Sequence, residues 1–238
     1  MFKYILFDMD GTLLHFDHEE FARAYFTLLG ARLAHLVEPK LLIEKLLLST
    51  TKIKKNLDEG KTNKQVFWEN FTQNLNISAE VLMPAVDQFY HEDFRMVRRI
   101  TKRDINARNI LNTVISKGKG IVVATNPIFP MVAVKQRLEW AGVADIPFKH
   151  ITSYEKSHFC KPTIEYYQEI LQHLSCQPEE CLMVGNDVEE DLAAGKIGIK
   201  TYLVTDNMIN SKGLEPKADY ISTLAELAVN IDGLLTKD

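Results

Sequence analysis

The sequence lacks any long run of uncharged apolar residues, although 46% of its 238 residues are hydrophobic. Its richest apolar stretch, residues 41–48, is interrupted by Glu44 and Lys45, whereas a bilayer span needs roughly 20 apolar residues in succession. The apolar run near the N-terminus stops at Asp8, so it has neither the length nor the cleavage site of a signal peptide. These absences predict a cytoplasmic protein with no membrane partner.

Cysteine and excess charge are also scarce. The three cysteines, Cys160, Cys176 and Cys181, are an odd number without CxxC spacing, which favours reduced thiols over a disulfide framework. The formal net charge is only −4, so no strong field attracts nucleic acid or anionic lipid. We therefore expect no nucleic-acid partner, and the sequence leaves the oligomeric state open.

No internal repeat or low-complexity segment is present, so hydrophobic periodicity is the main structural signal. Short apolar runs predict buried strands, and amphipathic segments with helical spacing lie between them. This alternation predicts an α/β fold with a mostly parallel sheet flanked by helices. The predicted strands are residues 4–7, 121–124, 181–184 and 201–204. Helices are predicted at about residues 131–141, from near Pro162, after Asp187, and over a last segment that carries Leu224 to Leu234.

Between residues 16 and 97 every periodic segment is helical. Asp17 with Glu20, and Thr62 with Gln65, have the spacing of helix-capping boxes. No strand pattern interrupts this stretch. The predicted division is a core domain of residues 1–15 and 98–238 and a small all-helical domain of residues 16–97.

Three aromatic residues in this helical stretch recur at helical spacing. Phe67, Trp68 and Phe71 are interpreted as its apolar core rather than as a platform for substrate, because such a stripe usually faces the interior.

Polar residues follow three of the predicted strands. Asp8, Thr125 and Asp187 each stand just beyond an apolar run. In parallel sheets, ligands bind beyond the carboxyl ends of the strands. The fold would therefore bring these distant residues to one edge of the sheet.

Asp8 and Asp10 leave the first strand two residues apart, and Gly11 allows a tight turn directly after them. Two carboxylates this close repel each other, and a bound divalent cation removes that repulsion. One carboxylate can then act as a nucleophile while the other transfers protons. Oxygen ligands favour Mg²⁺, which also binds substrate phosphate.

Four segments in order resemble the motifs of the haloacid dehalogenase (HAD) superfamily, whose first motif is DxDGT. A helical insert lies between the first and second segments, where that family places its C1 cap, and the resemblance covers nearly the whole chain. It implies a Rossmann-like HAD core plus a helical C1 cap. The four segments are Asp8 to Leu14, Ala124-Thr125-Asn126, Lys161-Pro162, and Gly185-Asn186-Asp187 with Asp191.

The resemblance implies a role for each acid of the first motif. Asp8 would attack phosphorus, and Asp10 would protonate the departing oxygen and later deprotonate the hydrolytic water. Mg²⁺ would be held by the Asp8 carboxylate, the Asp10 backbone carbonyl and Asp187.

The second and third motifs would hold the phosphoryl group. By the same resemblance, the Thr125 hydroxyl and the Asn126 backbone N–H bind its oxygens. Lys161 would neutralise charge on the nucleophile and the phosphate, which suits phosphoryl transfer because that reaction depends on positioning and positive charge.

The fourth motif departs from the commonest family form, which has Asp directly after Gly. Asn186 holds that position here and Asp187 follows it, so either residue can be the metal ligand. Asp187 is preferred because a charged oxygen binds Mg²⁺ better. Asp191 is a second ligand or an outer-shell acceptor, while Glu189 and Glu190 are interpreted as acids that stabilise a helix N-terminus.

The function implied is that of a magnesium-dependent phosphatase for a small phosphorylated metabolite. A 2-haloacid dehalogenase would share the aspartate nucleophile, but in that branch the position of Asp10 typically carries another residue. A sugar phosphomutase or a catalytically silent HAD-fold binding protein would also share these motifs.

Overall fold

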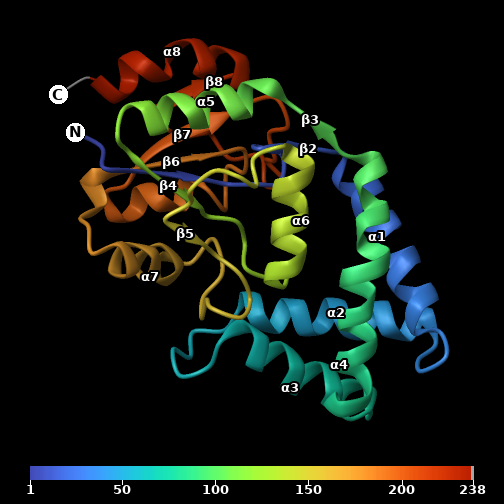
Figure 1. The fold of residues 1–238 in the computed structure, drawn as a ribbon. Helices are drawn as coiled ribbons and strands as arrows, with labels where there is room; N and C mark the ends of the chain where they lie inside the picture. The colour runs from blue at the N-terminus through green and yellow to red at the C-terminus, as the bar shows by residue number, and fades with distance from the viewer. Residues whose placement is uncertain (237–238) are drawn as a thin grey trace.

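The computed structural model describes residues 1–236. Six parallel strands form one sheet in the order β5-β4-β1-β6-β7-β8 (Figure 1). This confirms the predicted α/β fold with its parallel sheet. The strands are β1 (Tyr4–Phe7), β4 (Gly120–Val123), β5 (His150–Ile151), β6 (Cys181–Gly185), β7 (Lys200–Val204) and β8 (Tyr220–Ser222).

Helices cover both faces of the sheet because successive strand residues point to opposite sides. On one face, Phe7 and Val123 belong to the apolar cluster that includes α5 (Ile105–Ser116) and α8 (Leu224–Thr236). On the other face, Leu6 and Val122 pack with α7 (Ile164–Leu174). The short strands are buried on both sides, which explains why they read as continuous apolar runs in the sequence.

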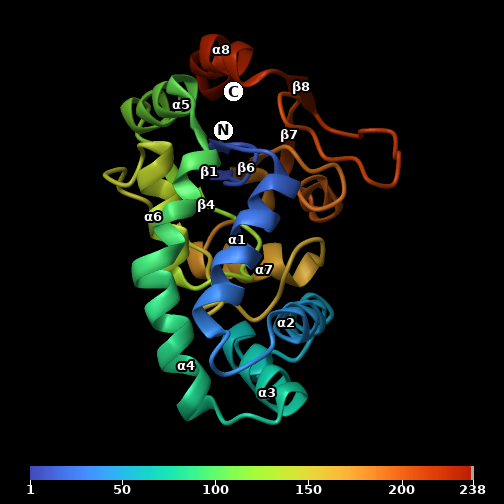
Figure 2. The ribbon, with the colours of Figure 1, turned by 90° about the vertical axis from the view of Figure 1, so that its right-hand side faces the viewer.

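The stretch predicted to be helical contains four α-helices (Figure 2). Asp17 accepts a hydrogen bond from the Glu20 amide at 2.8 Å, and Thr62 with Gln65 forms a complete capping box. The fourth helix continues through a π-helical turn into a 3₁₀ segment that returns to the sheet. The elements are α1 (His18–Leu33), α2 (Pro39–Lys54), α3 (Asn63–Leu75), α4 (Ala79–Gln88), η1 (Phe89–Asp93) and η2 (Phe94–Ile100).

A two-stranded antiparallel sheet joins the two chain segments that connect the helices to the core. β2 (Leu14–His15) pairs with β3 (Lys102–Arg103). The sequence pattern did not predict these strands, nor did it predict β5 and β8, which have two and three residues. Such short segments carry too little periodicity to be recognised without their partners.

Two predicted helices differ in detail from the observed ones. The helix expected near Pro162 begins at Ile164, with Thr163 as its N-cap residue. The segment after Asp187 is only a 3₁₀ helix, η4 (Leu192–Ile197). The helix expected between the second and third motifs is present as α6 (Met131–Ala141).

Within residues 1–236, no helix is both long enough and apolar enough to cross a membrane. The cysteines Cys160, Cys176 and Cys181 are free thiols, as expected.

Candidate active site

Asp8 begins the loop that follows β1, and the chain turns sharply there. The amides of Leu13 and Leu14 both donate to the Met9 carbonyl, at 3.0 and 2.9 Å. Gly11 has a φ of +90°, and a Cβ at this position would lie 2.3 Å from the side-chain nitrogen of Asn186. Only glycine permits both this backbone conformation and this close approach.

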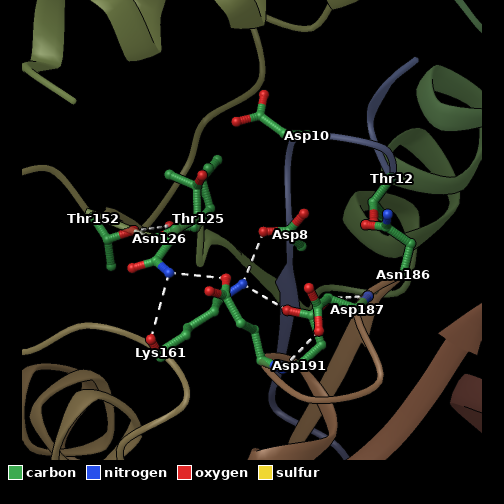
Figure 3. A network of polar contacts seen from close by, with 12 residues as sticks. Asp8, Asp10, Thr12, Thr125, Asn126, Thr152, Lys161, Asn186, Asp187 and Asp191 are labelled. Atoms are coloured by element: carbon green, nitrogen blue, oxygen red, sulfur yellow. Dashed lines mark hydrogen bonds and ion pairs between the residues drawn. The ribbon is translucent and has the colours of Figure 1, made fainter. Parts of the chain in front are cut away.

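Lys161 links the first and fourth motifs beneath this loop (Figure 3). Its ammonium group donates to Asp8 at 2.8 Å and to Asp191 at 2.6 Å. Burial lowers the pKa of Lys161, but the carboxylates of Asp191 and Asp8 outweigh burial and raise that pKa well above its usual value. The lysine is therefore a permanent cation in the floor of the site.

One lysine cannot compensate two buried carboxylates. Burial raises the pKa of Asp8 from 3.8 to about 8, with Asp191 and Asp10 adding to the rise and Lys161 opposing it. The ionised form of Asp8, which a nucleophile requires, is thus under-compensated by this chain alone. A divalent cation beside Asp8 would supply the missing positive charge.

Asp10 carries the second carboxylate of the first motif, and Figure 3 shows it directed away from Asp8. Its Oδ2 accepts a hydrogen bond from the guanidinium of Arg137, which belongs to α6 and is fully buried. Within residues 1–236, Asp10 Oδ1 and Arg137 Nη2 are buried without a hydrogen-bond partner. Both atoms have therefore given up hydrogen bonds to water without gaining a partner in this part of the chain.

Sequence reasoning missed Arg137, although the sequence contains a signal for it. The residue lies on the buried face of α6, and a charged side chain on an apolar helix face predicts a buried partner. The other buried residues of this helix are Ala133, Val134, Leu138, Trp140 and Ala141.

Thr125 and Asn126 follow β4. Two hydroxyls, from Thr152 at 2.7 Å and Tyr166 at 2.9 Å, donate to the Thr125 carbonyl and fix the backbone there. The Asn126 side chain donates to Glu190 at 2.8 Å. Glu190 is thus part of the site and not only an acid at a helix start, which corrects the interpretation from the sequence.

Asn186 is enclosed by partners. Its side-chain oxygen accepts from the Thr12 hydroxyl at 2.9 Å, and its nitrogen donates to the Asn207 carbonyl at 2.7 Å. Asn207 in turn donates to the Gly11 carbonyl at 3.2 Å. Asn186 therefore ties the loop after β6 to the loop after β1.

Asp187 and Asp191 have different surroundings. One oxygen of Asp187 accepts from the amides of Glu189 and Glu190, both at 2.8 Å, and burial raises the pKa of the group. Both oxygens of Asp191 are occupied, one by Lys161 and the other by the Asp187 amide at 2.8 Å. Asp191 is fully buried, so it positions its neighbours.

One open pocket of about 300 Å³ brings together most of the residues that the motifs single out. Seven of them line it at one edge of the sheet, and Lys161 lies against Asp8 below them. The seven are Asp8, Asp10, Thr125, Asn126, Asn186, Asp187 and Asp191.

The donor set of this pocket fits magnesium, because carboxylate and carbonyl oxygens are the ligands that Mg²⁺ prefers. Across residues 1–236, no three Asp, Glu, His or Cys side chains gather closely enough to enclose a metal ion. Two carboxylates with a backbone carbonyl and water would have to complete the shell. Mg²⁺ commonly binds in this way, since it keeps several of its waters.

Lys54 brings a further cation to the pocket from the helical stretch. It ends α2 and donates to Glu190 at 2.9 Å. Sequence reasoning missed this residue, since one lysine in a helix with several others carries no distinguishing signal.

A family model described as haloacid dehalogenase-like hydrolase matches residues 2–198 of the chain. A curated relative, the glyceraldehyde 3-phosphate phosphatase of Methanothermobacter thermautotrophicus, is 31% identical over 119 residues. That match covers 49% of this chain and 48% of the relative, so it spans about half of that protein's length.

Solved structures with the same fold align over almost the whole chain. A HAD phosphatase from Thermococcus onnurineus has a TM-score of 0.61 at 18% identity and covers 97% of this chain and 98% of its own. The HAD hydrolase YfnB from Bacillus subtilis, whose structure has bound magnesium, has a TM-score of 0.55 at 18% identity with 99% of both chains covered. At these identities the likeness establishes the fold.

Proposed function

This chain belongs to the haloacid dehalogenase-like hydrolase family, and on that premise we propose that it hydrolyses a small phosphorylated metabolite through an aspartyl-phosphate on Asp8. The observation that carries the proposal is the buried Lys161, which holds Asp8 at 2.8 Å beside a second acid two residues further on. The curated relative is itself a phosphatase of a small metabolite, which supports the same reaction class.

In the first step an oxygen of Asp8 attacks phosphorus in line, and the ester P–O bond breaks. Asp10 donates a proton to the departing oxygen from Oδ1, which has no hydrogen-bond partner within residues 1–236, while Arg137 holds Oδ2. In the second step Asp10 removes a proton from water, which attacks the aspartyl-phosphate and releases inorganic phosphate.

Three positively polarised groups would surround the phosphoryl oxygens. We assign the Thr125 hydroxyl, the Asn126 backbone N–H and the Lys161 ammonium to this role. Positive charge in a fixed geometry stabilises the transition state of phosphoryl transfer more than any covalent contribution.

We assign magnesium binding to the Asp8 carboxylate, the Asp10 backbone carbonyl and Asp187. When bound, the metal would neutralise charge on Asp8 and on the phosphoryl group. Asp187 is preferred over Asn186 because both polar atoms of Asn186 already have partners. Asp191 acts on Lys161 instead.

We further propose that residues 16–97 are a C1 cap on a core of residues 1–15 and 98–238. The strands β2 and β3 lie on the core side of this division and are paired with each other. The cap would then supply Lys54 and the apolar residues that face the catalytic pocket.

The test is phosphate release from a panel of phosphomonoesters with Mg²⁺, with Asp8→Asn as the matched blank. We expect turnover in the wild type and loss of at least about 1,000-fold in the variant, because the nucleophile is removed. Equal turnover in both proteins would overturn the proposal.

The same two proteins distinguish the competing functions. Chloride release from 2-chloropropionate without metal would identify a dehalogenase. Isomerisation of glucose 1-phosphate with little phosphate release would identify a mutase. Tight binding of a metabolite without turnover would identify a binding protein.

A further inference from the structure

A second cavity lies beside the catalytic pocket, among α1, α2, α3 and the loop after β4. Its volume is about 150 Å³, and a cavity of about this size in another protein admits benzene. The side chains that line it are mostly apolar. Among them are Phe67, Trp68 and Phe71 from α3, together with Phe21, Ile128 and Phe129.

The lining carries no Asp, Glu, Lys, Arg or His. Its aromatic polar atoms are also paired with one another: the hydroxyls of Tyr25 and Tyr90 are 2.8 Å apart, and the indole of Trp68 donates to the Tyr154 hydroxyl at 3.4 Å. A polar ligand would lose hydrogen bonds to water here and gain few in return, whereas an apolar one would gain contacts.

The cavity adjoins the catalytic pocket, because Phe21, Ile128 and Phe129 line both. Phe129 also packs under the guanidinium of Arg137, 4.4 Å from its ring centre, and that guanidinium binds Asp10. The group that would protonate a leaving oxygen thus adjoins the wall between the two spaces. The organic part of an ester that extends from a phosphoryl group at Asp8 into this cavity would pass Phe129, which lines both spaces.

We propose that this cavity binds the leaving group of the substrate, and that the preferred substrates are phosphomonoesters of uncharged aromatic or branched-hydrocarbon alcohols. The proposal rests on the phosphatase function proposed above. Phe67, Trp68 and Phe71, interpreted from the sequence as plain core, would then be substrate contacts. Protein interiors are close-packed with few voids larger than water, so ligand binding accounts for an apolar space of this size.

The kinetic test compares kcat/KM for phenyl phosphate and glycerol 3-phosphate. Ala22 and Ala24 are both half-buried in α1, but only Ala22 lines the cavity. Ala22→Phe would therefore fill the cavity, and Ala24→Phe is the matched control. The quantity compared is kcat/KM for phenyl phosphate divided by kcat/KM for glycerol 3-phosphate. We expect Ala22→Phe to lower this ratio by about tenfold or more, since a buried ring contributes that much binding. Ala24→Phe should leave the ratio unchanged.

Leu46→Gln gives a second perturbation that adds polarity without adding bulk. We expect it to lower the same ratio, so the proposal remains testable if the larger side chain of Ala22→Phe disturbs folding. A ratio that neither substitution changes would overturn the proposal.

A binding test needs no turnover. The chain has two tryptophans, and Trp68 lines the cavity while Trp140 does not. In ¹⁵N-labelled protein, phenol should shift the Trp68 indole resonance and leave Trp140 in place, and glycerol should shift neither. Assignment follows from Trp140→Phe.

The two proposals fail in different ways. If phenol shifts the Trp68 resonance but the protein hydrolyses no phosphate ester, the phosphatase function is refuted and the proposal that the cavity binds apolar molecules stands. If both esters are hydrolysed without a Trp68 shift and without a preference for phenyl phosphate, the proposed role of the cavity is refuted and the phosphatase function stands.

Discussion

Arg137 places a fully buried guanidinium against the carboxyl group of Asp10. Burying a charge is costly unless it is paired, so each group requires the other. The arrangement also decides where the proposed acid points before substrate binds, because the hydrogen bond holds Asp10 away from Asp8. Arg137 is therefore a positioning residue for proton transfer.

Replacing Arg137 with Met, which has similar length but no charge, should lower kcat by about 10- to 100-fold with a smaller change in KM. The reason is that Asp10 would lose its fixed orientation, and acid–base catalysis is worth about 100-fold or more. Steady-state kinetics on the best phosphate ester measure the effect. Arg137→Lys should restore part of kcat, and a kcat of Arg137→Met equal to wild type would contradict the positioning role.

The pKa of Asp8, raised to about 8, links folding to pH. Between about pH 4 and pH 8 the folded protein keeps a proton on Asp8 that the unfolded chain releases, so this group lowers the free energy of unfolding as pH rises. An asparagine at position 8 cannot ionise, so Asp8→Asn should abolish this fall in the free energy of unfolding. We expect the variant to gain at least about 1 kcal/mol relative to wild type between pH 5 and pH 8, since one pKa unit is worth about 1.4 kcal/mol.

Denaturant unfolding in the presence of a chelator would measure this gain. Asp87→Asn, which changes an exposed acid of α4, is the control and should show no such trend. If the stability gained by Asp8→Asn becomes smaller as pH rises, burial does not govern the pKa of Asp8.

The loop between β6 and η4 combines two functions in neighbouring residues. Asn186 holds the loop to the first motif, while Asp187 presents a carboxylate to the pocket. Asp187→Asn should weaken Mg²⁺ binding by about tenfold or more, because a charged oxygen is lost. Asn186→Ala should instead lower the free energy of unfolding by about 1–3 kcal/mol, because buried polar groups lose their partners.

Calorimetric titration with Mg²⁺ and denaturant unfolding of both variants separate these effects. If Asn186→Ala loses Mg²⁺ affinity and Asp187→Asn keeps it, Asn186 is the ligand and our assignment is wrong.

The elements that the sequence predicted well are those whose local pattern agrees with their surroundings. The strand at residues 4–7 and the helix at residues 131–141 were predicted with their observed bounds, and α8 has clear periodicity. β5 and β8 were missed because they owe their strand conformation to pairing with β4 and β7, which no local pattern reveals.

The candidate site divides in the same way. The gathering of Asp8, Thr125 and Asp187 was predictable because parallel strands end at one edge. The partners of Arg137 and Lys54 were not predictable, because Asp10 and Glu190 lie 127 and 136 residues away from them in the sequence. The choice between Asn186 and Asp187 depended on hydrogen bonds that only the folded loops define.

The helical stretch is attached to the rest of the molecule by backbone and side-chain bonds as well as apolar packing. Asn63, at the start of α3, is fully buried and donates from its side chain to the carbonyls of Pro127 and Phe159 at 3.2 and 3.3 Å. Its amide also donates to the Ser157 carbonyl at 2.8 Å. Opening of the proposed cap must break these bonds.

Asn63→Ala should therefore loosen the contact between α3 and the core and lower the free energy of unfolding by about 1–3 kcal/mol. Hydrogen exchange should accelerate in residues 63–66 and at the connections near residues 14–17 and 97–101, where we expect the hinges. Asn74→Ala, on the exposed side of the same helix, is the control. Exchange equal to wild type at all three segments would show that Asn63 does not hold the two parts together.

The pairing of β2 with β3 brings residues that are far apart in the sequence to neighbouring positions: Leu14 faces Arg103 and His15 faces Lys102. Everything between them is, in effect, one very long hairpin loop closed at its base. The helices are therefore connected to the six-stranded sheet through the paired strands β2 and β3, whichever segment lies between these two strands. We expect that the intervening helices could be replaced by another bundle with equally spaced ends, provided that its underside packs against the core, without a shift in the register of any strand.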